Sequence, residues 1–175
     1  MNSVGKRSLL LLVLTLPLFA AAQSAPSINW ISLSEAEQKM QKAPKKVLID
    51  IYTDWCGWCK KLDATTYRDP RVVEYINEKF YAVKFNPEKQ QSITFKGKTY
   101  GMNGRNNAIT PLLMGSSRGY PTTTFLDEKL EVISPVSGYQ NAEMMLTILK
   151  YIGENHYQTT DWNSYMNGQK KSGSN

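Results

Sequence analysis

The amino-acid sequence predicts an α/β domain with a central mixed β-sheet that is flanked by helices on both faces. Segments with strand-like and helix-like apolar patterns follow one another in the order strand, helix, strand, helix, strand, helix, strand, strand, helix. The run Lys46–Thr53 is almost continuously apolar, which is typical of a strand in the middle of a sheet. With 175 residues, the chain is also long enough to bury a core without cross-links.

The N-terminal segment 1–22 has the plan of a signal peptide. Lys6 and Arg7 precede an apolar run over residues 9–19, and three alanines end the segment at Ala22. The apolar run is shorter than the ~20 residues of a transmembrane helix. We therefore expect cleavage after Ala22 and export, to the bacterial periplasm or as a secreted protein, with an uncleaved anchor as the alternative.

The charge of the chain argues against a nucleic-acid partner. The 21 basic and 15 acidic residues give a net charge of +6, and loss of Lys6 and Arg7 would leave 19 against 15, or +4. This balance is mild and the basic residues are scattered along the chain, so no basic face is predicted. The pair Lys170–Lys171 lies in a C-terminal tail, residues 157–175, which we expect to be loosely ordered from Asp161 onward.

The first half of the domain begins with a short strand and a capped helix. Residues 28–31 suit an edge strand, and Ser34–Glu37 has the pattern of a capping box that opens a helix to about Lys42. Pro44 ends this helix because proline cannot continue it. The buried strand Lys46–Thr53 follows.

Two helical segments and a strand come next. A helix is predicted from Cys56 to about Tyr67, and Asp69-Pro70 then supplies an N-cap and a first-turn proline for a second helical stretch. The inward-facing residues of that stretch are predicted to be Val72, Val73 and Ile76. Residues 80–85 return as a strand.

The segment 86–119 is the least regular part of the chain. Residues 93–95 and 98–100 flank Lys96-Gly97 and suit a small hairpin. Residues 107–114 suit a short helix that is broken or begun at Pro111.

Two strands and a helix complete the domain. Residues 122–126 and 131–136 are predicted strands joined by the polar turn 127–129. Asn141 is expected to cap a last helix over residues 142–154. The apolar side chains that repeat at helical spacing there, and are expected to pack on the sheet, are Met145, Leu146, Leu149 and Ile152.

The only two cysteines, Cys56 and Cys59, stand two residues apart directly after the buried strand. A cysteine at the start of a helix is favoured as a thiolate, which is the form that attacks disulfides. Cysteines three apart on a helix face the same side and can close a disulfide. We therefore expect Cys56, exposed at the helix start, to act as nucleophile and Cys59 to resolve the mixed disulfide.

An inert disulfide and a zinc site are the competing interpretations of the cysteine pair. A loop of about four residues would contribute only ~2 kcal/mol to stability, which is little for a chain that can fold alone. Structural zinc needs four cysteine or histidine ligands, and the chain offers Cys56, Cys59 and its single histidine, His156. Neither a metal nor a cofactor is expected.

Four motifs that are separated along the chain resemble motifs of the thioredoxin superfamily. Asp50 lies six residues before Cys56 on the buried strand, and Trp55–Lys60 reads Trp-Cys-Gly-Trp-Cys-Lys. Further on lie Val83–Asn86, with Lys84 near the end of a strand, and Arg118–Thr122, which reads Arg-Gly-Tyr-Pro-Thr. The resemblance covers residues 47–154 and is strongest to exported thioredoxin-related proteins, including the soluble thiol domain of periplasmic disulfide-interchange reductases.

The resemblance implies a thioredoxin-like fold over residues 23–156. Gly57-Trp58 stands where cytosolic thioredoxins have Gly-Pro, and residues 87–104 have no counterpart there, so they form an insertion. Because the dipeptide between the cysteines shifts the redox potential, its replacement leaves the direction of electron flow open.

The resemblance also assigns roles to individual residues. Asp50 would lie beneath Cys59 and accept its proton while Lys84 tunes the charge of Asp50, although an exposed strand position for Asp50 is the alternative. Pro121 would be cis and face the cysteines, with an ordinary trans proline at the start of a strand as the alternative. The residues expected to contact a client are Trp55, Gly57, Trp58, Tyr120 and Pro121, although simple helix packing would also explain Trp58.

The leading functional hypothesis is an exported, monomeric thiol:disulfide oxidoreductase that reduces or isomerises disulfides in client proteins. It would draw electrons from an upstream thiol donor, which could be membrane-bound. One alternative is a non-enzymatic peptide-binding module in which Cys56 and Cys59 form a locked disulfide. A second alternative is a dedicated thiol partner in cytochrome or copper-centre maturation.

Overall fold

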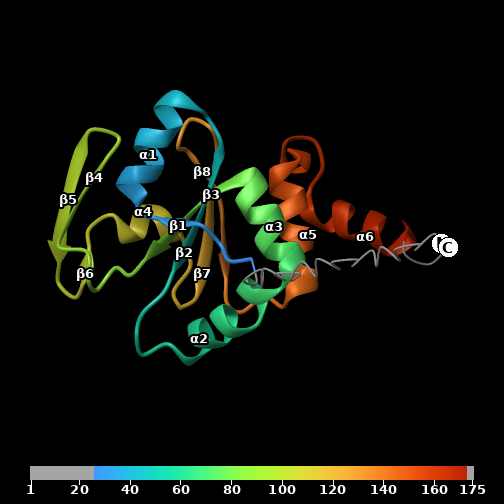
Figure 1. The fold of residues 1–175 in the computed structure, drawn as a ribbon, viewed down its shortest axis with the longest axis horizontal. Coiled ribbons are helices and arrows are strands. Elements are labelled where there is room, and N and C mark those ends of the chain that lie inside the picture. Colours follow the sequence, from blue (N-terminus) through green and yellow to red (C-terminus); the bar gives the residue numbers. More distant parts are fainter. Residues whose placement is uncertain (1–25, 173–175) are drawn as a thin grey trace, which may run out of the picture.

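A five-stranded mixed sheet forms the centre of the computed structural model, which describes residues 26–172 (Figure 1). The strands stand in the order β1 (Trp30–Ile31), β3 (Phe80–Phe85), β2 (Lys46–Ile51), β7 (Thr122–Leu126), β8 (Val132–Ser137). Strands β1, β3 and β2 run parallel, whereas β7 is antiparallel to β2 and β8. The predicted mixed sheet is therefore confirmed, and the predicted signal segment 1–22 lies outside the described residues.

Helices cover both faces of this sheet, as predicted. One face carries α1 (Leu33–Lys42) and α4 (Thr110–Met114), and the other carries α3 (Pro70–Lys79) and α5 (Ala142–Gly153), as Figure 1 shows. Because side chains alternate along a strand, Val47, Ile49 and Ile51 of β2 join the α1 side, while Leu48 joins the α3 and α5 side. Asp50 is thus on the same face of β2 as Leu48.

The start of α1 differs from the prediction. Ser32 is the N-cap, and its hydroxyl accepts a hydrogen bond of 3.1 Å from the Glu35 backbone N–H, so the predicted capping box at Ser34 is wrong by two residues. Both serines suit a cap, but starting the helix at Leu33 buries that side chain, which is 3 % exposed.

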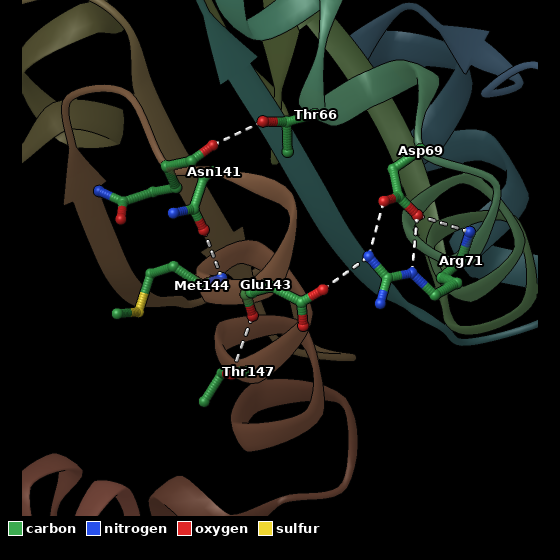
Figure 2. Close-up of polar contacts among 8 residues, drawn as sticks. Thr66, Asp69, Arg71, Asn141, Glu143, Met144 and Thr147 are labelled. Atoms are coloured by element: carbon green, nitrogen blue, oxygen red, sulfur yellow. Dashed lines mark hydrogen bonds and ion pairs between the residues drawn. The ribbon is translucent and has the colours of Figure 1, made fainter.

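The helix predicted from Cys56 to Tyr67 is shorter in the structure. It forms α2 (Gly57–Ala64) with Cys56 as its N-cap, followed by a 3₁₀ turn, η1 (Thr66–Arg68). Asp69 caps α3 as predicted, by accepting a hydrogen bond of 3.0 Å from the Arg71 backbone N–H. The guanidinium of Arg71 then reaches Glu143 of α5 at 2.7 Å (Figure 2), which links α3 to α5.

A hydrogen bond also holds η1 against the start of α5. The hydroxyl of Thr66 donates a hydrogen bond of 2.6 Å to the backbone carbonyl of Gln140 (Figure 2). Asn141 caps α5 as predicted, by accepting a 2.9 Å hydrogen bond from the Met144 backbone N–H. The segment that follows the cysteine helix is therefore held at two points.

The irregular segment after β3 contains a small sheet of its own. The predicted hairpin is confirmed as β4 (Ser92–Phe95) and β5 (Lys98–Asn103), and a third strand, β6 (Asn106–Asn107), pairs with β5. Residues 96 and 97 form the hairpin turn with positive φ angles of 50° and 74°. Ile93 and Phe95 are buried in the core on the α1 side, which fixes this β4–β6 module (residues 92–107) to the domain.

The C-terminal part is more ordered than predicted. Instead of a loose tail after Asp161, the structure has a 3₁₀ turn, η2 (His156–Gln158), and a helix, α6 (Trp162–Ser172). Tyr165 of α6 is 8 % exposed, and its ring centroid lies 5.0 Å from that of Tyr151 of α5. The polar composition of this segment indicated a tail, but its aromatic side chains supply enough apolar area for docking.

We expect Tyr165→Ala to lower the free energy of unfolding by about 2 kcal/mol, because it removes the buried aromatic contact between α6 and α5. Asn167→Ala on the same helix is the control, since Asn167 is exposed. Denaturant unfolding of both variants checks this, and equal stabilities would show that α6 does not contribute to the core.

No helix among residues 26–172 has the length and apolar character needed to cross a membrane.

Candidate active site

The two cysteines form a disulfide at the N-terminus of α2. The Cα atoms of Cys56 and Cys59 are 5.3 Å apart, and the Cys59 backbone N–H donates a hydrogen bond of 3.0 Å to Cys56 Sγ. Cys56 therefore occupies the N-cap position, where free backbone N–H groups and the helix dipole stabilise negative charge. On reduction, Cys56 is the sulfur that this position favours as a thiolate.

The exposure predicted for Cys56 is wrong for the disulfide form. Cys56 is only 5 % exposed and Cys59 only 2 %. The reason is that the Cys56 sulfur is bonded inward to Cys59, which is itself buried. The neighbouring Trp55 and Trp58 are instead 60 % and 58 % exposed, so these indoles present the apolar surface around the disulfide. Trp58 belongs to neither of the two core clusters.

Asp50 and Lys84 meet across two adjacent strands. They are register partners in the β2–β3 pair, and Lys84 Nζ lies 2.6 Å from Asp50 Oδ2. Asp50 is 1 % exposed, which excludes the exposed strand position. Burial raises the pKa of Asp50 from 3.8 to about 6, although the ammonium of Lys84 acts in the opposite direction. The second oxygen, Oδ1, has no hydrogen-bond partner among the described residues.

Lys84 is enclosed by a second carboxylate and by aromatic rings. Its ammonium also bonds to Asp63 of α2, and it lies over aromatic rings at centroid distances of 4.8 Å (Tyr52), 5.0 Å (Trp30) and 5.6 Å (Tyr67). Burial disfavours the charged ammonium, but Asp50 and Asp63 outweigh it, so the pKa of Lys84 is raised.

Sequence reasoning missed Asp63. The available signal was its spacing, since Asp63 stands four residues after Cys59 and so one helical turn along the same face of α2. Asp63 is partly exposed, with 44 % of its side chain accessible, whereas Asp50 is buried. The chain Asp50, Lys84, Asp63 therefore connects the buried carboxylate to the surface.

Tyr120 and Pro121, in the loop before β7, lie against the tryptophans that flank the cysteine pair. The Tyr120–Pro121 peptide bond is cis, as predicted. The Tyr120 ring lies edge-on to Trp55 at a centroid distance of 5.8 Å. Gly57 begins α2, and a Cβ added there would meet no atom within 4 Å, so this side of the helix start is open.

An aromatic groove of about 310 Å³ lies beside Pro121. Its walls are Trp58, Tyr120, Pro121, Gly138 and Tyr139. The Trp58 and Tyr139 rings are 5.7 Å apart between centroids, and Lys61 Nζ lies 4.9 Å and 5.0 Å from the two ring centres. Sequence reasoning missed Tyr139, because only the fold brings the loop between β8 and α5 to the cysteine helix.

Trp55 is tied to the segment that carries the β4–β6 module. Its indole Nε1–H donates to the Glu88 carboxylate at 3.0 Å, and Arg105 of the β5–β6 turn bonds the same carboxylate at 2.7 Å. The Arg105 guanidinium also lies 6.0 Å from the Trp55 ring centre. Neither Glu88 nor Arg105 was predicted as a site residue, and no short-range motif marks either of them.

Within residues 26–172, no three His, Cys, Asp or Glu side chains are grouped so that they could hold a metal ion.

A family model for the thioredoxin-like domain matches residues 33–153. The chain is 29 % identical over 129 residues to the thiol:disulfide interchange protein DsbD of Pectobacterium atrosepticum, a match that covers 71 % of this chain and 19 % of that protein. The DsbD protein of Photorhabdus laumondii is 30 % identical over 129 residues, with coverage of 69 % and 19 %. The chain therefore spans about a fifth of the length of the curated relatives it matches.

Solved structures share the fold. A thioredoxin-fold protein from Helicobacter pylori superposes with a TM-score of 0.55 at 19 % identity, covering 73 % of this chain and 81 % of that one. A thioredoxin from Thermus thermophilus superposes with a TM-score of 0.54 at 18 % identity, with coverage of 72 % and 87 %. These likenesses establish the architecture in which the cysteine pair is held.

Proposed function

The chain belongs to the thioredoxin-like domain family, and from this premise we propose that it is an exported thiol:disulfide oxidoreductase that reduces or isomerises disulfides in client proteins. The observation that carries the proposal is the Cys56–Cys59 disulfide at the start of α2, together with the cis bond of Tyr120-Pro121. The similarity to DsbD, whose name describes thiol:disulfide interchange, supports the same chemistry.

The first chemical step is attack by the reduced protein on a client disulfide. The Cys56 thiolate forms a bond to one client sulfur, and the client S–S bond breaks to release a client thiolate, which takes a proton from solvent. The helix N-terminus favours this step because it lowers the pKa of a thiol at the N-cap position.

The second step closes the disulfide seen in the structure. Cys59 loses its proton and attacks Cys56 Sγ, which breaks the mixed disulfide and releases the second client thiolate. The client gains two electrons, and the Cys56–Cys59 pair loses two. We propose Asp50 as the group that accepts the Cys59 proton, because it is buried, has an unpartnered oxygen, and has a pKa of about 6.

Clients are proposed to bind across the aromatic groove. Trp58, Tyr120 and Tyr139 provide rigid apolar walls, and Pro121 lies in the same groove. Such a groove suits an extended segment with an apolar side chain beside its cysteine. Trp55 and Gly57 would contribute the remaining contacts around the sulfurs.

The electron source is a further part of the proposal. Each reduction of a client leaves the protein as the Cys56–Cys59 disulfide, so a thiol donor must reduce it before the next reduction. We propose an upstream dithiol protein, in the membrane or outside it, with the chain itself acting as a monomer. Export through segment 1–22 would place the protein where client disulfides form.

Reduction of insulin by dithiothreitol tests the proposed activity. We expect catalytic amounts of the mature protein to shorten the delay before the insulin B chain precipitates, relative to dithiothreitol alone. No acceleration would contradict the oxidoreductase proposal and would favour a peptide-binding module with a locked disulfide.

A further inference from the structure

A second cavity shares Tyr120 with the aromatic groove. It encloses about 300 Å³ between the β4–β6 module, α4 and the loop that approaches Pro121. Its walls include Asn103 and Asn106 from the module, Thr110 from α4, and Ser117, Arg118 and Tyr120 from the loop. Tyr120 lines both cavities, so the two cavities adjoin.

The module wall of this cavity is fixed by buried hydrogen bonds. Asn107 is 1 % exposed, and its Nδ2 donates to the carbonyls of Gln90 at 2.7 Å and Tyr100 at 3.0 Å. Its Oδ1 accepts from the Ile109 backbone N–H at 3.0 Å. With the Arg105–Glu88–Trp55 contacts described above, this network holds the wall in place before a ligand arrives, which reduces the entropic cost of binding.

The polar groups of the cavity are mixed, and its one charge is positive. Thr110 donates its hydroxyl proton to the Asn107 carbonyl at 2.6 Å, and Asn106 Oδ1 has no hydrogen-bond partner among the described residues. Arg118 is the only charged residue among the lining residues, and no carboxylate pairs with it in the described part of the chain. The Ser117 hydroxyl accepts a hydrogen bond of 2.6 Å from Ser137 and so keeps its own proton for another acceptor. The positive charge of Arg118 and the free proton of Ser117 therefore favour an anionic group in the cavity.

We propose that this Arg118 pocket, defined by Asn103, Asn106, Thr110, Ser117, Arg118 and Tyr120, is a client subsite for an aspartate or glutamate side chain near the client cysteine. The assignment rests on the proposed function, whose site it extends. A cavity of about 300 Å³ is at the small end of ligand sites, which suits a single side chain. The pocket would select clients by the charge on one side of their cysteine.

Peptide binding to the oxidised protein tests the subsite without requiring turnover. The probes are extended peptides in which serine replaces the client cysteine. At each flanking position in turn, the peptides carry glutamate, glutamine or lysine. Calorimetric titration of the full mature protein is expected to show about fivefold tighter binding for glutamate than for glutamine at one position only, because a carboxylate forms stronger hydrogen bonds with a guanidinium than an amide does.

Variants distinguish an effect of the Arg118 pocket on peptide binding from an effect of the overall positive charge of the protein. We expect Arg118→Gln to abolish the glutamate preference and Arg118→Lys to keep part of it, whereas Arg68→Gln, which removes the same charge from another exposed arginine, keeps it all. A preference that survives in Arg118→Gln, or that is lost equally in Arg68→Gln, would overturn the assignment. If the wild-type preference depends on Arg118 but no peptide disulfide is reduced, the subsite is supported and the oxidoreductase proposal fails.

Discussion

Replacing Cys56 with serine is expected to lower the rate of client disulfide reduction at least about a thousandfold, because a serine hydroxyl is not ionised near neutral pH and cannot form a mixed disulfide. The rate is measured with a peptide disulfide and dithiothreitol as the electron donor. Retention of the wild-type rate by Cys56→Ser would show that the Cys56 thiolate is not the nucleophile.

Cys59→Ser is the matched control for this prediction. It keeps the nucleophile at the start of α2 but removes the sulfur that resolves the mixed disulfide. We therefore expect Cys59→Ser to accumulate a covalent client adduct on Cys56, and Cys56→Ser to accumulate little. Both variants lack the disulfide, so any loss of stability from its removal affects them equally.

Asp50→Asn is expected to stabilise the folded protein by about 3 kcal/mol above pH 7, because it removes a carboxylate that must be ionised while 1 % exposed. The magnitude follows from the rise of the Asp50 pKa from 3.8 to about 6, at about 1.4 kcal/mol for each pKa unit. The variant is also expected to resolve mixed disulfides more slowly, since the proposed proton acceptor is lost.

The stability difference between Asp50→Asn and wild type is expected to depend on pH. The folded protein holds the Asp50 proton more tightly than the unfolded chain does, so the wild-type protein loses stability as the pH rises from 3.8 through about 6. Asp50→Asn lacks this titration. Its advantage over wild type should therefore vanish below pH 3.8, grow through the interval, and stay constant above it.

Denaturant unfolding across this pH range measures the difference. Asp63→Asn is the control, because Asp63 bonds the same ammonium but is 44 % exposed and has little desolvation to relieve. If Asp50→Asn is less stable than wild type at pH 8, ionisation of the buried Asp50 carboxylate does not lower the free energy of unfolding as argued.

The central strand and its acidic residue could be predicted from the sequence because the pattern is local. Asp50 interrupts a continuous apolar run, which indicates a buried charge with a special role. Lys84 was inferred through family resemblance, and the register of β2 and β3 is what brings it opposite Asp50. Neither residue alone reveals that pairing.

The remaining site residues depend on contacts between distant segments. Glu88 reaches Trp55 because the parallel strands β2 and β3 end at the same edge of the sheet, with Ile51 opposite Phe85. Tyr139 meets Trp58 only because β8 lies at the sheet edge beside β7. Single-sequence patterns describe one element at a time, so such contacts cannot be predicted from them. For the same reason α6 could not be predicted, because it is held in place by the packing of Tyr165 on α5.

The time course of a single turnover tests the central claim most directly. Reduced wild-type protein is mixed with an equimolar peptide disulfide, quenched in acid, alkylated and mapped by mass spectrometry. We predict a transient mixed disulfide on Cys56, followed by the Cys56–Cys59 disulfide with one peptide disulfide reduced for each protein molecule oxidised. Two results would contradict the account. In one, both cysteines remain accessible to alkylation and the peptide disulfide persists. In the other, the mixed disulfide forms on Cys59.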